Sequence, residues 1–193
     1  MSRSDLKILV GIANFGTKNQ WYLRRLLHEY RRMPHKVDLC VFSNIPKSLG
    51  EDVEVCMGLP EKDPWSLPHA HKKVFADRAD RYDLFIYSED DTLITREAVD
   101  AFMEVSAVLP DTRIAGFIRY ELDGDGRRSY STIHSHFHWV PDSVQTYGHF
   151  RTARLTNEHS GCYMATRRQL HRAVASGGYL IAPSEGRYDK LCT

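Results

Sequence analysis

The chain has 193 residues, of which 42% are hydrophobic and 26% charged, and its formal net charge is +1. These values predict one globular domain with a real core, and they exclude a strong global field that would select nucleic acid or an anionic membrane. No run of 18 apolar residues is present, so no transmembrane segment is expected. Without a signal-peptide pattern or a CxxC motif, and with four cysteines far apart in sequence, the chain is predicted to be cytoplasmic and reduced.

The first half alternates strand patterns with helix patterns. In chain order we expect a strand over 6–12, a helix over 19–33, strands over 37–43 and 53–57, a helix over 69–81, a strand over 84–87, a helix over 95–109 and a strand over 114–120. Strands that alternate with helices predict βαβ units and a mostly parallel sheet. Cys40 and Cys56 lie in apolar runs and are interpreted as small core residues.

The second half is rich in loops. Gly, Ser, His and aromatic residues crowd the stretch 123–159, a short strand is expected at 163–165, and Thr166 is expected to cap a helix that runs to Ala175. Gly177 and Gly178 would end that helix. We therefore expect one α/β domain over 1–193, with a nucleotide-binding half over about 1–120 and an acceptor-binding half over about 121–193.

The most informative stretch is an apolar run, 84–87, that is followed by Ser88 and then by Glu89, Asp90 and Asp91. The absence of alternation predicts a strand buried on both faces, and ligands of open α/β sheets bind beyond the carboxyl ends of such strands. Three adjacent carboxylates repel one another unless a cation offsets them, and as hard oxygen donors they suit Mg²⁺ or Mn²⁺. Such a cation is one way to hold a diphosphate. Ordinary turn chemistry at a strand end is the alternative.

The loop after the first strand has the glycine spacing of a P-loop, with Gly11 and Gly16 separated by four residues. A P-loop needs Lys followed by Ser or Thr, whereas Thr17 here precedes Lys18, which misplaces both groups. A dinucleotide GxGxxG motif is also absent. We expect instead a strand-end loop in which Ala13, Asn14 and Phe15 contact a base or ribose.

Other polar clusters have two interpretations each. His134, His136 and His138 would share one face of a strand, as a Zn²⁺ or Fe²⁺ cluster or as a polar substrate rim; the rim is favoured because no Cys or carboxylate lies nearby. Lys72 and Lys73 either reach a diphosphate or form a solvated helix face. The arginine pairs at 24–25 and 31–32 are interpreted as a solvated helix face rather than a nucleic-acid patch.

Taken in order, these pieces resemble a GT-A glycosyltransferase. The likeness rests on the opening strand with Ala13-Asn14, the second strand ending at Ser43-Asn44, the strand that ends in a DxD-like triplet, and the later segment 160–164 followed by a helix. It implies a Rossmann-like, mostly parallel central sheet flanked by helices.

The resemblance also implies residue roles. Glu89 and Asp91 match the first and last acids of the family's motif, of which the last binds the metal that bridges the donor diphosphate; Asp90 takes the middle position. Ala13-Asn14 and Ser43-Asn44 match nucleoside contacts, and Gly161 matches the segment lining the sugar and acceptor site. Glu185 or Asp189 lies where inverting members place the catalytic base.

Two features depart from the family's pattern. Glu89 replaces the usual Asp, and the further His ligand that many members supply from a C-terminal segment has no counterpart after Asp189. Three alternatives follow: a further segment supplies that ligand, an internal histidine supplies it, or the metal site is minimal.

The predicted function is transfer of a sugar from a nucleotide-sugar donor to a hydroxyl of a glycan or other acceptor, with Mn²⁺ or Mg²⁺. A nucleotidyltransferase of similar layout and a non-catalytic sugar-binding or partner-binding domain are the alternatives.

Overall fold

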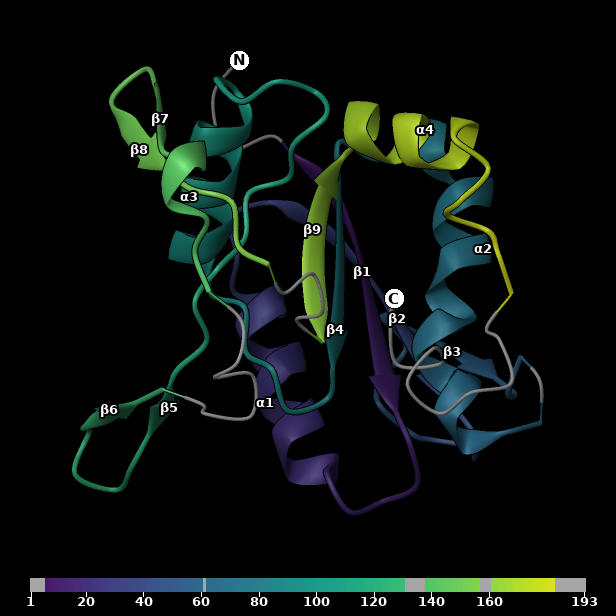
Figure 1. The fold of residues 1–193 in the computed structure, drawn as a ribbon. Helices are drawn as coiled ribbons and strands as arrows, with labels where there is room; N and C mark the ends of the chain where they lie inside the picture. Colours follow the sequence, from purple (N-terminus) through teal and green to yellow (C-terminus); the bar gives the residue numbers. More distant parts are fainter. Residues whose placement is uncertain (1–5, 61, 131–137, 157–160, 183–193) are drawn as a thin grey trace.

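A five-stranded sheet forms the centre of the molecule in the computed structural model, which describes residues 6–60, 62–130, 138–156 and 161–182 (Figure 1). Its strands are β1 (Lys7–Asn14), β2 (Lys36–Ser43), β3 (Val53–Met57), β4 (Leu84–Glu89) and β9 (Cys162–Thr166). They lie in the order β3-β2-β1-β4-β9. The first four are parallel, and β9 pairs with β4 in the antiparallel sense.

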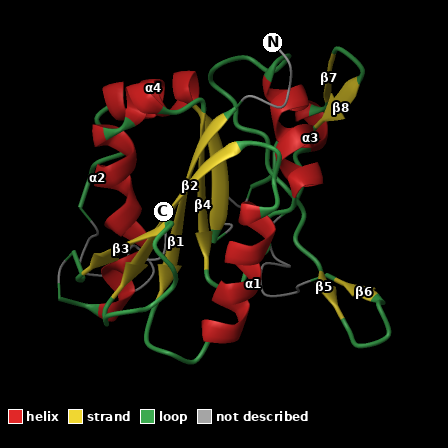
Figure 2. Cartoon of the chain, turned by 180° about the vertical axis from the view of Figure 1, so that it is seen from behind, coloured by secondary structure: helices red, strands yellow, loops and turns green. Residues whose placement is uncertain are grey.

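Helices cover both faces of this sheet (Figures 1 and 2). Helices α1 (Gln20–Arg31) and α3 (Arg96–Ser106) lie on one face, and α2 (Ala70–Asp77) and α4 (Arg167–Ala175) lie on the other. Short 3₁₀ turns are η2 (Pro64–His69), η3 (Ala79–Arg81) and η4 (Pro141–Ser143). Two small hairpins, β5 (Glu121–Leu122) with β6 (Arg128–Ser129) and β7 (Gln145–Tyr147) with β8 (Phe150–Thr152), lie outside the sheet.

The core is divided by the sheet according to the two-residue period of a strand. Alternate residues of β1 and β4 pack on opposite faces: Ile8, Val10 and Ile86 join the α1/α3 side, whereas Leu9 and Phe85 join the α2/α4 side. All five are at most 1% exposed, which explains why these strands show no polar alternation.

The strand order creates a switch point between β1 and β4. From β1 the chain continues through α1 to β2 and β3 on one side, and it returns to place β4 on the other side of β1. The carboxyl ends of β1 and β4 therefore meet at this switch point, the place where open α/β sheets bind their ligands.

The predicted α/β class, with a mostly parallel central sheet flanked by helices, is confirmed. Thr166 caps α4 through a full capping box, and Gly177 follows at φ +77°, as expected. The expected helix over 69–81 is shorter, because Pro68 and the turn at Arg78 leave α2 flanked by two 3₁₀ turns.

The expected strand over 114–120 is wrong. This segment has no regular structure, and Ile114, Phe117 and Ile118 are 42–63% exposed. The sheet position beside β4 is filled by β9, and the apolar segment pairs with none of the described strands. No helix in the described ranges has the length and apolar character that crossing a bilayer requires.

Candidate functional site

The candidate site lies where β1 and β4 end side by side. Ala13 pairs with Glu89, so Asn14 and Asp90 follow at the same level of the sheet. The acidic triplet thus stands at the switch point, as the sequence pattern predicts for a ligand-binding strand end.

Asp90 is the buried centre of this edge, with 7% exposure. Asn14 Nδ2 donates to Asp90 Oδ2, and Asn19 Nδ2 donates to Asp90 Oδ1 at 2.7 Å. Burial raises the pKa of Asp90, and the two amide donors act in the opposite direction. Asn19 occupies the N-cap position of α1 without capping it, because its side chain turns to the carboxylate.

The expected strand-end loop begins later than predicted. Asn14 is the last residue of β1 and fully buried, and Ala13 is 7% exposed, so neither is free in a loop. Of the three, Phe15 lies in the loop and is 47% exposed. Asn14 Oδ1, however, is buried beside Asp90 and has no hydrogen-bond partner among the described atoms.

Glu89 and Asp91 flank the buried aspartate. Burial raises the pKa of Glu89, and the neighbouring Asp91 and Asp90 charges raise it further, while Arg119 acts in the opposite direction. Asp91 is exposed beyond the strand end. A cation placed between these carboxylates would relieve the same repulsion that raises the pKa of Glu89.

Gly161 is brought against this edge by the antiparallel β9. Its carbonyl accepts from Glu89 N at 3.0 Å, and its φ is +63°. A Cβ at this position would lie 3.5 Å from Glu89 Oε2 and 3.4 Å from Arg119 Nη1. The fold therefore places Gly161, Glu89 and Arg119 in one cluster.

The loop between β1 and α1 is held by the end of β2. Gly16 N donates to Asn44 Oδ1 at 2.7 Å, and Lys47 Nζ donates to Gly16 O. Ser43 is fully buried, and its Oγ accepts from Ile45 N. Asn44 thus holds the loop that follows β1, and Ser43 holds the turn at the end of β2.

The two predicted lysines lie on α2. Lys73 pairs with Asp77 at 2.6 Å, which fits a solvated helix face. Lys72 is half-buried, with Nζ 5.9 Å from the centre of the Tyr179 ring.

Several predicted residues lie outside the described ranges. These are the two base candidates, Glu185 and Asp189, and the histidines His134 and His136. His138 is exposed, and its backbone N donates to Thr156 Oγ1.

The fit of a divalent cation to the triplet depends on which carboxylates are free to hold it. Among the described residues, the sole set of three Cys, His or acidic ligands with all donor atoms within 4.8 Å lies elsewhere, so the three carboxylates do not converge on one point. Asp90 is committed to its two amides, which leaves Glu89 and Asp91 as the carboxylate ligands. Mg²⁺ commonly uses one or two carboxylates together with substrate phosphates and water, so Glu89 and Asp91 are the residues that would hold it here.

Three site residues were missed from the sequence: Asn19, Lys47 and Arg119. Lys47 and Arg119 interact electrostatically with Asp90 and Glu89, respectively. Of the three, only Asn19 stands in a recognisable sequence pattern, because an Asn at the start of a predicted helix is a typical capping residue. Lys47 and Arg119 reach the site from loops, and no local sequence pattern predicts where a loop residue lies in the fold.

The comparisons with known proteins add little. No family model matches the chain, and no curated protein matches it. Among solved structures, one titled "Crystal structure of 4-diphosphocytidyl-2C-methyl-D-erythritol synthase" matches with a TM-score of 0.47 and 11% identity, over 96% of this chain and 83% of that chain. No functional conclusion follows from a likeness at this level.

Proposed function

We propose that this chain is a nucleotide-dependent transferase that binds its donor's diphosphate at the carboxyl edge of β1 and β4. The observation that carries the proposal is the acidic triplet at the switch point of the sheet, with Asp90 buried and held by two amides. A buried carboxylate held this firmly fixes the backbone on both sides of it. The neighbouring Glu89 and Asp91 would then hold Mg²⁺ or Mn²⁺ in a preorganised position.

Each residue at the edge has a distinct part in this proposal. A divalent cation supplies stabilisation of the negative charge that develops on the departing phosphate. Asp90 is a positioning residue. The exposed Phe15 ring is the group available to a nucleoside, and the buried Asn14 acts through its hydrogen bond to Asp90. Arg119 supplies positive charge on the Glu89 side.

Sugar transfer to a hydroxyl acceptor is the reaction that we favour. Nucleotidyl enzymes usually bring a glycine-rich phosphate loop after the first strand, and Gly11 does not serve as one here. It lies inside β1, where a Cβ would come within 3.0 Å of the Phe42 and Phe75 rings, so its role is packing.

Nucleotidyl transfer is a second candidate, favoured by a different observation. Two cations, Lys47 and Arg119, interact electrostatically with Asp90 and Glu89 from opposite loops. Two cations at the edge would suit a triphosphate, which carries more negative charge than a nucleotide sugar.

Calorimetry with UDP, GDP, CDP, the matching triphosphates and the nucleotide sugars, with and without Mn²⁺, tests the binding site. We expect Mn²⁺-dependent binding of one nucleotide by the wild type, and a loss of about tenfold or more in affinity, about 1.4 kcal/mol, in Asp91→Asn and Glu89→Gln. Asp125→Asn, an exposed acid on the β5–β6 turn, is the matched control and should bind like the wild type. Equal affinity in Asp91→Asn and the wild type would refute the metal role.

Product analysis separates the two reactions. Release of a nucleoside diphosphate supports sugar transfer, and release of pyrophosphate supports nucleotidyl transfer. Metal-dependent binding without any turnover would overturn the catalytic proposal in favour of a binding domain.

A further inference from the structure

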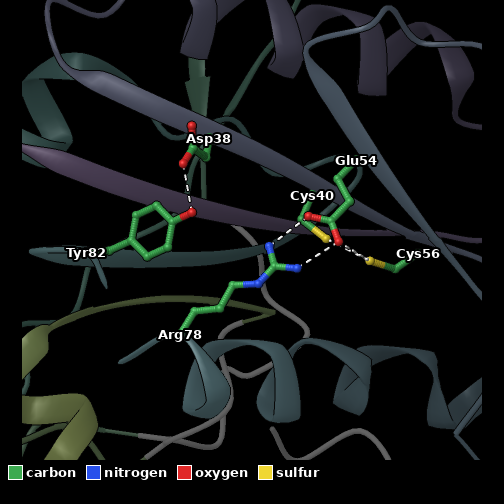
Figure 3. A network of polar contacts seen from close by, with 6 residues as sticks. All are labelled: Asp38, Cys40, Glu54, Cys56, Arg78 and Tyr82. Carbon is green, nitrogen blue, oxygen red and sulfur yellow. Dashed lines mark hydrogen bonds and ion pairs between the residues drawn. The ribbon is translucent and has the colours of Figure 1, made fainter. Parts of the chain in front are cut away.

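A second cluster of ligand groups lies on the α2 side of the sheet, on β2 and β3 (Figure 3). Cys40 Sγ and Cys56 Sγ are 3.1 Å apart, and Glu54 Oε1 lies 3.5 Å from Cys56 Sγ. The three donor atoms all lie within 4.8 Å of one another. None of these residues belongs to the nucleotide edge described above, so the cluster has no part in the proposed transfer reaction.

Strand register explains why residues 14 and 16 positions apart converge. Cys40 pairs with Glu54, and Phe42 pairs with Cys56, so Cys40, Glu54 and Cys56 project from the same face of two adjacent strands. β3 is the edge strand, which leaves Glu54 exposed and Cys56 half-buried, while Cys40 is fully buried.

The register argues against a disulfide. Cys40 and Cys56 are diagonal neighbours, two residues out of register. With strands about 4.8 Å apart and a rise of about 3.3 Å per residue, their Cα atoms would be roughly 8 Å apart. A disulfide spans about 4.4–6.8 Å between Cα atoms, so bridging this pair would require the backbone to move.

A shared metal ion requires no such movement. Two thiolates on one tetrahedral zinc ion, each about 2.3 Å from the metal, lie roughly 3.8 Å apart. The Sγ atoms of Cys40 and Cys56, now 3.1 Å apart, would need to separate only slightly to reach that distance. The carboxylate of Glu54 completes three protein ligands. A fourth position then remains for water on the exposed side of the edge strand.

Arg78 holds the Glu54 carboxylate in place as a metal ligand. Its Nη1 and Nη2 donate to Glu54 Oε2 and Oε1 at 2.7 and 2.8 Å, and this pairing lowers the pKa of Glu54. The carboxylate is therefore ionised and fixed in orientation, as the outer partners of metal ligands usually ensure. Two thiolates, one carboxylate and one guanidinium sum to a charge of −2, which a divalent ion neutralises.

An entry path is also present. An open cleft of about 410 Å³ is lined by Glu54 and Arg78, together with Asp38, Arg81 and Tyr82. The carboxylate side of the cluster therefore borders an open cleft. Of the three proposed ligands, Glu54 is the one that lines the cleft.

We propose that Cys40, Cys56 and Glu54 bind a thiophilic divalent cation of the zinc class. The proposal rests on the geometry of the three donor atoms, which lie within 4.8 Å of one another. Each sulfur binds as a thiolate, so any thiol proton leaves to solvent as the metal–sulfur bond forms.

The test uses metal-free, reduced protein titrated with Co²⁺ and then with Zn²⁺ against a chromophoric chelator. We expect one equivalent of Co²⁺ with the visible and ultraviolet bands of tetrahedral thiolate coordination, displaced by Zn²⁺. Cys56→Ser and Cys40→Ser should each lose these bands and weaken Zn²⁺ binding by at least about tenfold. Glu54→Gln should keep the thiolate bands with weaker binding. Cys162→Ser, with its thiol on β9, is the matched control and should behave as the wild type.

Circular dichroism of each variant establishes that it is folded before titration. Because Cys56 is half-buried, its Ser variant is the decisive one if Cys40→Ser fails to fold. The proposal is overturned if the wild type binds no Zn²⁺, or if Cys56→Ser binds as tightly as the wild type. It is also overturned if the metal-free protein treated with a low-molecular-weight disulfide yields a Cys40–Cys56 disulfide and binds no ion when reduced again.

Discussion

The buried histidine of α2 makes the stability of this protein depend on pH in a specific way. His71 is fully buried and stacked on Tyr87, with ring centroids 3.9 Å apart. Its Nδ1 lies 2.7 Å from Pro68 O, and its Nε2 lies 2.6 Å from the Tyr163 hydroxyl. A carbonyl oxygen accepts only, so Nδ1 carries the proton and Nε2 accepts from Tyr163. The ring is therefore held neutral.

Burial lowers the pKa of His71 from 6.5 to about 3. Between these two values the unfolded chain binds a proton that the folded chain excludes, so stability is lost as the pH falls below 6.5. From pH 7 to pH 5 the loss works out at about 2 kcal/mol for this one group, since each pKa unit corresponds to about 1.4 kcal/mol. No comparable loss from this group is expected above pH 7.

Urea denaturation of the wild type and His71→Gln at pH 7 and pH 5 measures this effect. The variant should be less stable at pH 7, because it breaks the contacts to Pro68 and Tyr163, yet it should lose about 2 kcal/mol less than the wild type on going to pH 5. His149→Gln, an exposed histidine on the β7–β8 turn, is the control and should keep the wild-type dependence. Equal losses in the wild type and His71→Gln would refute the argument.

Three further changes test the packing around the sheet by urea denaturation. Asn14→Ala removes a buried donor to Asp90 and should cost about 1.5–3 kcal/mol, the range for hydrogen bonds to charged groups; a loss below about 0.5 kcal/mol would contradict this. Gly11→Ala places a Cβ 3.0 Å from two aromatic rings and should cost about 1–3 kcal/mol, whereas Gly124→Ala, with open space around it, should stay within about 0.5 kcal/mol of the wild type. Thr166→Ala removes the capping box of α4 and should cost about 1 kcal/mol, while Thr166→Ser should retain most of the stability.

Much of the central architecture was predictable from local patterns. Continuous apolar runs located β1 and β4, and β3 was predicted with its observed bounds. Thr166 and Gly177 marked both ends of α4. These predictions succeeded because burial on both faces, side-chain capping and positive φ each impose a requirement within a few neighbouring residues.

The segment 114–120 shows where local patterns stop being informative. Its apolar residues match a strand in composition, but a strand needs a partner, and β9 already occupies the edge of β4. Whether an apolar run pairs is decided by competition with segments far away in the chain, which no window of sequence contains.

The sequence by itself determined the class of the fold and the position of the acidic triplet at the end of a buried strand. Only the tertiary structure decided that Asn14 holds Asp90 across 76 residues, and that Cys40 meets Cys56 on neighbouring strands. The physical reason is that period and propensity report how deeply a residue is buried and on which face. Contacts between distant residues follow from strand order and register, which are settled by the packing of the whole sheet.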